Sequence, residues 1–94
     1  MTAALNSLCE RAVLNDVAVR LEEAGITPLA VTWTPYGSRI QVADSDWAKI
    51  RKMYAAYEES AEMRKISIGR AVRVSRSPVA GVEVLALLDM AGAE

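Results

Sequence analysis

The chain has 94 residues, of which 52% are hydrophobic and 24% charged, and its 11 basic and 12 acidic side chains give a net charge of -1. This length indicates one domain over residues 1–94, and so large an apolar fraction with so little net charge excludes a disordered chain. The nearly neutral total also excludes the strong overall field of a protein that coats nucleic acid or an anionic membrane, so such contacts need a local patch.

The chain has a single cysteine, Cys9, and no histidine. One cysteine forms no internal disulfide, no basic and apolar leader opens the sequence, and no apolar run is long enough to cross a bilayer, so we expect a cytoplasmic protein without membrane contact. Histidine is the usual general base near neutral pH and the commonest zinc ligand. With no histidine and no glycine-rich phosphate loop, we expect no enzyme, no metal site and no cofactor.

The first predicted element is an amphipathic helix over residues 4–24, where apolar residues recur in steps of three and four. Gly25 follows the last periodic residue and suits a left-handed helix end, which would let Ile26 pack back on Leu21. Cys9 lies on the apolar stripe of this helix, so we expect its thiol to be buried and unreactive.

Residues 29–43 predict a β-hairpin. The two runs 29–34 and 39–43 alternate in side-chain character, and their β-branched and aromatic residues favour strands. Between them, the segment Thr-Pro-Tyr-Gly at 34–37 has proline second and glycine fourth, as a type I turn favours. The turn would expose Tyr36.

A second helix is predicted over residues 45–63. The segment Asp-Ser-Asp at 44–46 contains helix-capping residues, and the apolar stripe that follows would place Trp47, Tyr54 and Tyr57 in the core. The basic residues of this stretch come early and the acidic ones late, which is the reverse of what the helix dipole favours. Tertiary packing would therefore have to hold this helix.

Residues 66–76 alternate as a strand that Gly69 would kink or bulge. Two interpretations of residues 78–90 compete. In one, a hairpin loop at Gly81 leads into a strand over 82–88 that is apolar on both faces; in the other, Ser77 caps a helix that begins at Pro78. The valines and Gly81 favour the strand.

The element order αββαββ predicts an α+β fold, in which two helices lie on one face of a four-stranded, mainly antiparallel sheet. The other face would then bind a partner or be covered by a second copy. Because the strand over 82–88 needs cover on both faces and the helices supply one layer, we expect a homodimer through the sheet.

Residues 64–76 hold five basic side chains and no acidic one; these are Arg64, Lys65, Arg70, Arg73 and Arg76. Three interpretations stay open, namely a solvated strand whose charges discourage aggregation, a surface for an acidic protein and a nucleic-acid site. Acidic residues precede the stretch and no aromatic residue is interleaved to stack on bases, which makes nucleic acid the weaker of the two partners.

Trp33 and Tyr36 in the predicted hairpin, together with Arg39, are further candidate partner-binding residues, because these residue types are enriched at interface hot spots. Asp44 and Asp46 lack a third acidic neighbour that a magnesium site would need, and helix capping explains them.

We therefore expect a small non-enzymatic module that binds a larger protein or complex and inhibits it by occupying its surface. In size and lack of motifs alone, the chain is comparable with inhibitors made by phages and mobile elements, anti-CRISPR proteins among them. No segment matches a family motif. The alternative is a nucleic-acid-binding module that uses the basic strand 64–76.

Overall fold

The computed structural model describes residues 3–66 and 69–89, with side chains from Cys9 to Lys65 and from Gly69 to Leu88. In these residues the elements are α1 (Ala3–Glu23), β1 (Ala30–Thr34), β2 (Gly37–Gln41), the 3-10 turn η1 (Asp44–Asp46), α2 (Trp47–Met53), β3 (Glu59–Ile66), β4 (Gly69–Val79) and β5 (Val82–Asp89). The class is α+β, as predicted.

Helix α1 ends as the sequence predicts. Gly25 has a φ of 84°, the left-handed conformation that glycine adopts without steric cost. The N–H of Gly25 donates to the carbonyl of Glu22 at 3.0 Å, and the N–H of Ile26 donates to the carbonyl of Leu21 at 2.9 Å. These two bonds form the Schellman motif, and they direct the fully buried Ile26 back against the helix.

The sheet has five strands in the order β1-β2-β5-β4-β3, so the prediction of four strands is wrong. Strands β1 and β2 form the predicted antiparallel hairpin, and β3, β4 and β5 form an antiparallel meander. Strand β5 pairs with β2 in parallel, which makes the sheet mixed. The N–H of Ser38 donates to the carbonyl of Gly81 at 2.8 Å and ties the two hairpin turns together.

The predicted helix over 45–63 is wrong in its second half, because α2 ends at Met53 and β3 begins at Glu59. Strand β3 pairs with β4 from Glu59 opposite Arg76 to Ile66 opposite Gly69. Tyr57, which belongs to the apolar stripe that suggested a longer helix, is 45% exposed and so does not fill the core as predicted. Pairing with a neighbouring strand overrides a helical periodicity that buries so little.

The expected side-chain cap of this helix is also absent. Asp46 makes no capping hydrogen bond, and its carboxylate lies 3.5 Å from the ammonium of Lys49. The carboxylate of Asp44 instead accepts the N–H of its neighbour Ser45 at 2.8 Å. The 3-10 turn η1 thus leads directly into α2, and no side chain caps the N-terminus of this helix.

The C-terminal region forms a hairpin, and the alternative helix over residues 78–90 is wrong as far as Asp89. Ala80 and Gly81 form the turn between β4 and β5, and the φ of Gly81 is 83°, as the hairpin interpretation requires. Gly69 begins β4 instead of kinking a longer strand, and Ser67 and Ile68 lie outside the described residues.

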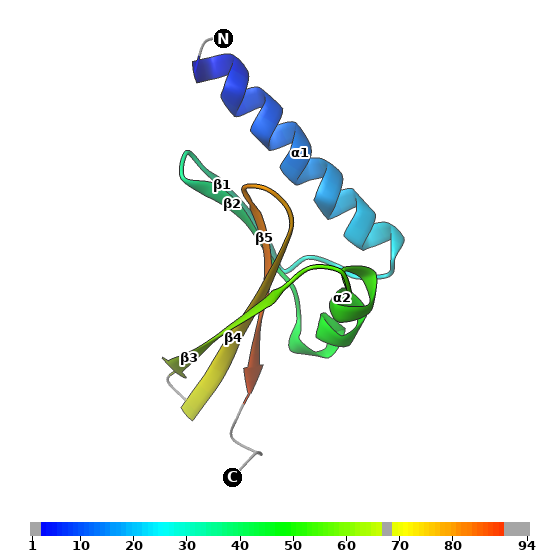
Figure 1. Ribbon diagram of the computed structural model, residues 1–94, viewed down its shortest axis with the longest axis vertical. Coiled ribbons are helices and arrows are strands. Elements are labelled where there is room, and N and C mark those ends of the chain that lie inside the picture. The colour runs from blue at the N-terminus through cyan, green and yellow to red at the C-terminus, as the bar shows by residue number, and fades with distance from the viewer. Residues whose placement is uncertain (1–2, 67–68, 90–94) are drawn as a thin grey trace.

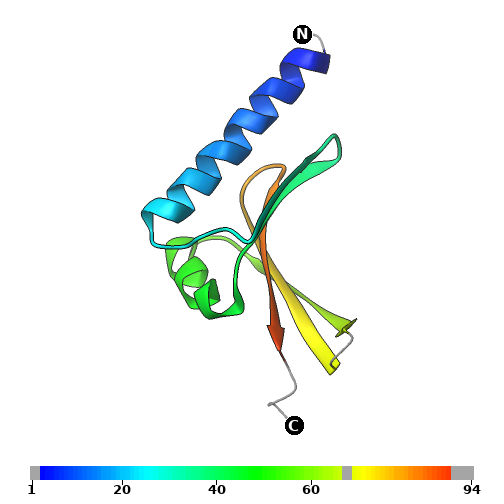
Figure 2. The same ribbon diagram turned by 180° about the vertical axis from the view of Figure 1, so that it is seen from behind.

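Both helices lie on the same face of the sheet, and the N-terminal part of α1 and the β3–β4 hairpin extend away from each other at opposite ends (Figures 1 and 2). The core fills the space between the helices and this face, and its largest described members include Leu21, Ile26, Ile40, Val42, Trp47, Ile50 and Val84. No helix of the described residues lies on the opposite face of the sheet. We call this the open face.

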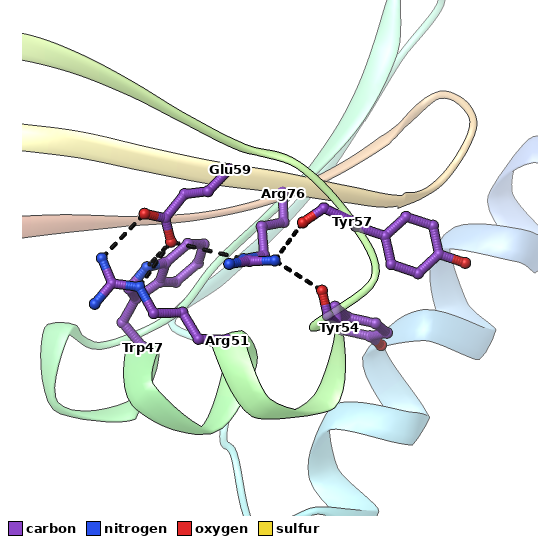
Figure 3. A network of polar contacts seen from close by, with 6 residues as sticks. All are labelled: Trp47, Arg51, Tyr54, Tyr57, Glu59 and Arg76. Atoms are coloured by element: carbon purple, nitrogen blue, oxygen red, sulfur yellow. Dashed lines mark hydrogen bonds and ion pairs between the residues drawn. The ribbon is translucent and has the colours of Figure 1, made fainter.

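A polar network joins α2, the segment after it and β4 (Figure 3). Oε1 of Glu59 accepts hydrogen bonds from the indole Nε1 of Trp47 and from Nε of Arg51, both at 2.8 Å, and Nη2 of Arg51 donates to Oε2 at 3.0 Å. The guanidinium of Arg76 donates to the backbone carbonyl of Tyr54 at 2.8 Å and to that of Tyr57, and its Nε lies 3.6 Å from Oε1 of Glu59.

This network explains why the helix ends where it does. The carbonyls at the C-terminus of a helix lack intrahelical partners, and the arginine of β4 supplies donors to two carbonyls beyond Met53. The hydrogen bonds from Arg51, and to a smaller extent that from Trp47, hold the pKa of the Glu59 carboxyl below its ordinary value, although partial burial opposes them.

We predict that Arg76→Ala lowers the free energy of unfolding by about 2–4 kcal/mol, because the partly buried Glu59 and two carbonyls lose a charged donor. Urea unfolding followed by circular dichroism measures the change. The matched control is Arg70→Ala, an exposed arginine in the same strand, for which we expect a change within about 0.5 kcal/mol. Equal losses in the two variants would contradict the structural role of Arg76.

The lowered pKa of Glu59 predicts a pH dependence of stability. Because the folded-state pKa is below the unfolded-state value of about 4.3, the carboxylate stabilises the fold at neutral pH and loses this effect as the pH falls below about 4. The difference in free energy of unfolding between the wild type and Glu59→Gln should therefore be largest near neutral pH and shrink on acidification.

Urea midpoints across a pH series test this prediction. Glu58→Gln, a change at the exposed neighbouring glutamate, is the control and should show a small difference from the wild type at every pH. A difference for Glu59→Gln that stays constant from neutral pH to pH 3 would show that ionisation of this carboxyl is not the cause.

Candidate functional site

The open face of the sheet carries a groove lined by arginines. Two adjoining hollows of about 450 Å³ each share Thr34, Arg39, Arg64 and Arg73 in their walls. We call the two hollows together the arginine groove. Its apolar floor comes from Leu85 and Leu87 of β5, the former 8% and the latter 37% exposed.

Strand register explains why these side chains meet. Arg39 lies opposite Glu83 across the β2–β5 pair, and Arg73 lies opposite Leu87 across the β4–β5 pair. Arg64 belongs to β3, on the far side of β4. Alternation along each strand points these side chains away from the helices, so three arginines from distant parts of the sequence reach one surface.

The arginine groove is positively charged in spite of two acidic neighbours. Arg73 forms an ion pair with Glu83, and Nη2 of Arg64 lies 3.3 Å from Oε2 of Glu62. Within the described part of the chain, Arg39 forms no ion pair, and Lys65 adds a further cation to the wall. The groove thus combines cations available to an anionic group with an apolar floor.

The structure gathers four of the eight candidate partner-binding residues in the groove wall, namely Arg39, Arg64, Lys65 and Arg73. Tyr36 is fully exposed in the β1–β2 turn and lines the second hollow of the groove, the one that also includes Glu83 and that we call the outer hollow. It is the single aromatic side chain among the described lining residues.

Three candidates lie elsewhere. Trp33 faces α1, with the guanidinium carbon of Arg11 at 4.3 Å from its ring centre, and its indole N–H has no acceptor in the described residues. Arg76 belongs to the network with Glu59. Arg70 lies toward the end of the β3–β4 hairpin and lines neither hollow of the groove; it borders a further hollow of about 310 Å³ whose lining includes Arg64 and Lys65. The basic strand is therefore divided between the two faces of the sheet.

Part of the groove consists of residues that were not among the candidates predicted from the sequence. Thr32 and Gln41 line it; Gln41 shares a face with Arg39 by alternation along one strand, and the hairpin register places Thr32 opposite Arg39. No local pattern in the sequence predicts that Leu85 and Glu83 line the groove, because only the parallel pairing of β5 with β2 brings them beside the hairpin.

Cys9 is exposed, so the prediction of a buried thiol is wrong. The N-terminal part of α1 extends past the strands that the rest of the helix covers (Figure 1). Cys9 borders a hollow of about 330 Å³ between this part of α1 and the two hairpin turns, together with Val13, Val79 and Val82.

Residues 3–66 and 69–89 contain no cluster of three or more side chains of the types that ligate metals. Neither described helix has the length and apolar content needed to cross a membrane.

Comparison of the chain with models of known protein families, with curated proteins and with solved structures gives no match. The function must therefore be inferred from the arginine groove and the surfaces beside it.

Proposed function

We propose that this chain is a non-enzymatic binding module that occupies a surface of a larger protein through the arginine groove. The observation that carries the proposal is the convergence of Arg39, Arg64 and Arg73, from three different strands, around an apolar floor. Side chains of this kind bind an anionic and apolar surface, and they offer no nucleophile paired with a base along the described lining.

The composition of the groove indicates an acidic segment of a protein as the partner. Guanidinium groups bind carboxylates through two parallel hydrogen bonds, and Leu85 and Leu87 provide apolar contact between the charges. A partner that alternates acidic and apolar side chains fits both features. Tyr36, at the outer end of the groove, is placed to contact the rim of such a partner.

Two observations favour a protein over nucleic acid. The basic strand 64–76 does not present a single surface, since Arg76 serves the network with Glu59 and Arg70 lies apart from the groove. The described floor of the groove also has no aromatic side chain on which bases could stack.

Such a module would act as an inhibitor by occupation. The described chain measures 51 × 26 × 22 Å, so a small elongated body presents the groove along one face. Binding that covers a functional surface of a larger complex blocks that surface without any chemical step.

We predict that a fluorescein-labelled peptide of alternating glutamate and leucine binds the protein and that Arg39→Ala/Arg64→Ala/Arg73→Ala weakens this binding at least about tenfold, because hydrogen bonds to charged groups contribute about 1.5–3 kcal/mol each. Fluorescence anisotropy measures the affinity. Single- and double-stranded oligonucleotides with the same label and net charge are measured in parallel over a range of salt concentrations.

Two variants serve as controls. Arg70→Ala removes an arginine outside the groove and should leave peptide affinity unchanged. Glu83→Gln removes the acid that pairs with Arg73 and should tighten peptide binding about two- to fivefold. Tighter binding of the oligonucleotides, with a steep salt dependence that the triple variant abolishes, would replace this proposal with the nucleic-acid function. Absence of binding to peptide and oligonucleotide alike would overturn both.

A further inference from the structure

The two edges of the sheet, which no described strand covers, differ in charge. Strand β3 forms one edge and carries four charged residues, Glu59, Glu62, Arg64 and Lys65. The other edge, residues 29–34, has none, and Leu29 and Val31 are 63% and 49% exposed there. Charged side chains protect an edge strand from pairing with another chain. Strand β3 has such side chains of its own, whereas β1 has none, and Arg11 of α1 is the charged group that lies over Trp33.

We propose that β1 pairs antiparallel with β1 of a second copy of this chain, so that two sheets join edge to edge across a two-fold axis. This goes beyond the proposed function and does not depend on it. Backbone N–H and C=O groups of alternate residues are unpaired along a free edge, and a second identical edge supplies their partners.

The residue pattern of β1 is complementary to itself. A two-fold axis that passes through Val31 or Thr32 pairs odd-numbered residues with odd-numbered ones, so the apolar Val31 and Trp33 meet apolar residues on the helix side. Ala30, Thr32 and Thr34 meet each other on the open face, where cross-strand threonine pairs are favourable. At the junction, the helix side of the joined sheet thus has apolar residues against apolar ones, and the open face has its threonines against each other.

Charge favours this edge over the face-to-face homodimer that the sequence suggested. Packing two open faces together would bury Arg39, Arg64 and Arg73 of both copies between sheets about 10 Å apart, where water and salt screen their repulsion poorly. In the edge-to-edge pair, the two β1 strands lie between the copies of Arg39. These copies are therefore three strand spacings of about 4.8 Å apart, which is more than the Debye length of about 8 Å at physiological salt.

The edge-to-edge pair leaves the arginine groove open. Thr32 and Thr34 form the β1 end of the groove, so the two grooves would meet at the axis on the same side of the joined sheet. Two acidic segments of one partner, or two copies of the partner, could then bind side by side.

Sedimentation equilibrium of the full chain from about 1 µM to about 1 mM tests the proposal. We expect a concentration-dependent dimer, and Val31→Lys should weaken it at least about tenfold, because the change places like charges beside each other across the axis and removes apolar contact. Met63→Lys, on the opposite edge where Met63 is 56% exposed, is the matched control and should leave the dimer unchanged.

A second measurement covers the case in which Val31→Lys disturbs folding. In a Cys9→Ser background, cysteine at position 31 or 32 should form a disulfide-linked dimer under mild oxidation, since directly opposed residues in an antiparallel pair lie close enough for this bond. Cysteine at position 63 should not. A monomer at every concentration, or a dimer that Arg73→Glu changes and Val31→Lys does not, would overturn the proposal.

The outcome is independent of the proposed function. The variant Arg39→Ala/Arg64→Ala/Arg73→Ala should keep the dimer while it loses the acidic peptide. Val31→Lys should bind the peptide with unchanged affinity per chain while it loses the dimer. Failure of one proposal thus leaves the other standing.

Discussion

The parallel pairing of β2 with β5 is the contact on which the rest of this structure depends. It joins the β1–β2 hairpin to the β3–β4–β5 meander, which would otherwise be two separate antiparallel units. The hydrogen bond from Ser38 to the carbonyl of Gly81 lies at one end of this junction, and that from Val42 to the carbonyl of Leu85 lies at the other. The junction buries Ile40 against Val84 on the helix side and sets Arg39 beside Glu83 on the open face.

The polar network around Glu59 is a consequence of the same arrangement. Once β4 lies beside β5, the side chain of Arg76 reaches the segment that follows α2 and binds the carbonyls of Tyr54 and Tyr57 (Figure 3). An interaction between parts of the chain that are far apart in the sequence thereby ends a helix and begins a strand. The same interaction keeps Arg76 out of the groove, so the arginines of the groove are Arg64 and Arg73 of the basic stretch together with Arg39.

Three surfaces of the sheet differ in composition. The helix-facing side carries the core, the open face carries the arginine groove, and the β1 edge is uncharged where the β3 edge is charged. The proposed partner and the proposed second copy use different surfaces, and Thr32 and Thr34 lie where the two meet. A binding module that joins edge to edge would present its grooves as a pair, which strengthens attachment to a partner with repeated acidic segments.

Local patterns by themselves determined α1 with its Schellman end and the β1–β2 hairpin with Tyr36 exposed, and they favoured the strand over the competing helix after Gly81. Each depends on residues within a few positions of one another, where periodicity and glycine conformation act directly. Only the tertiary structure decided the fifth strand, the exposure of Cys9 and the position of Arg39 beside β5. Strand β3 forms where the stripe suggested a helix because it pairs with β4, Cys9 lies on a part of α1 that extends past the strands, and Arg39 reaches β5 through the parallel pairing of two distant segments. Local periodicity carries no information about which segments become neighbours.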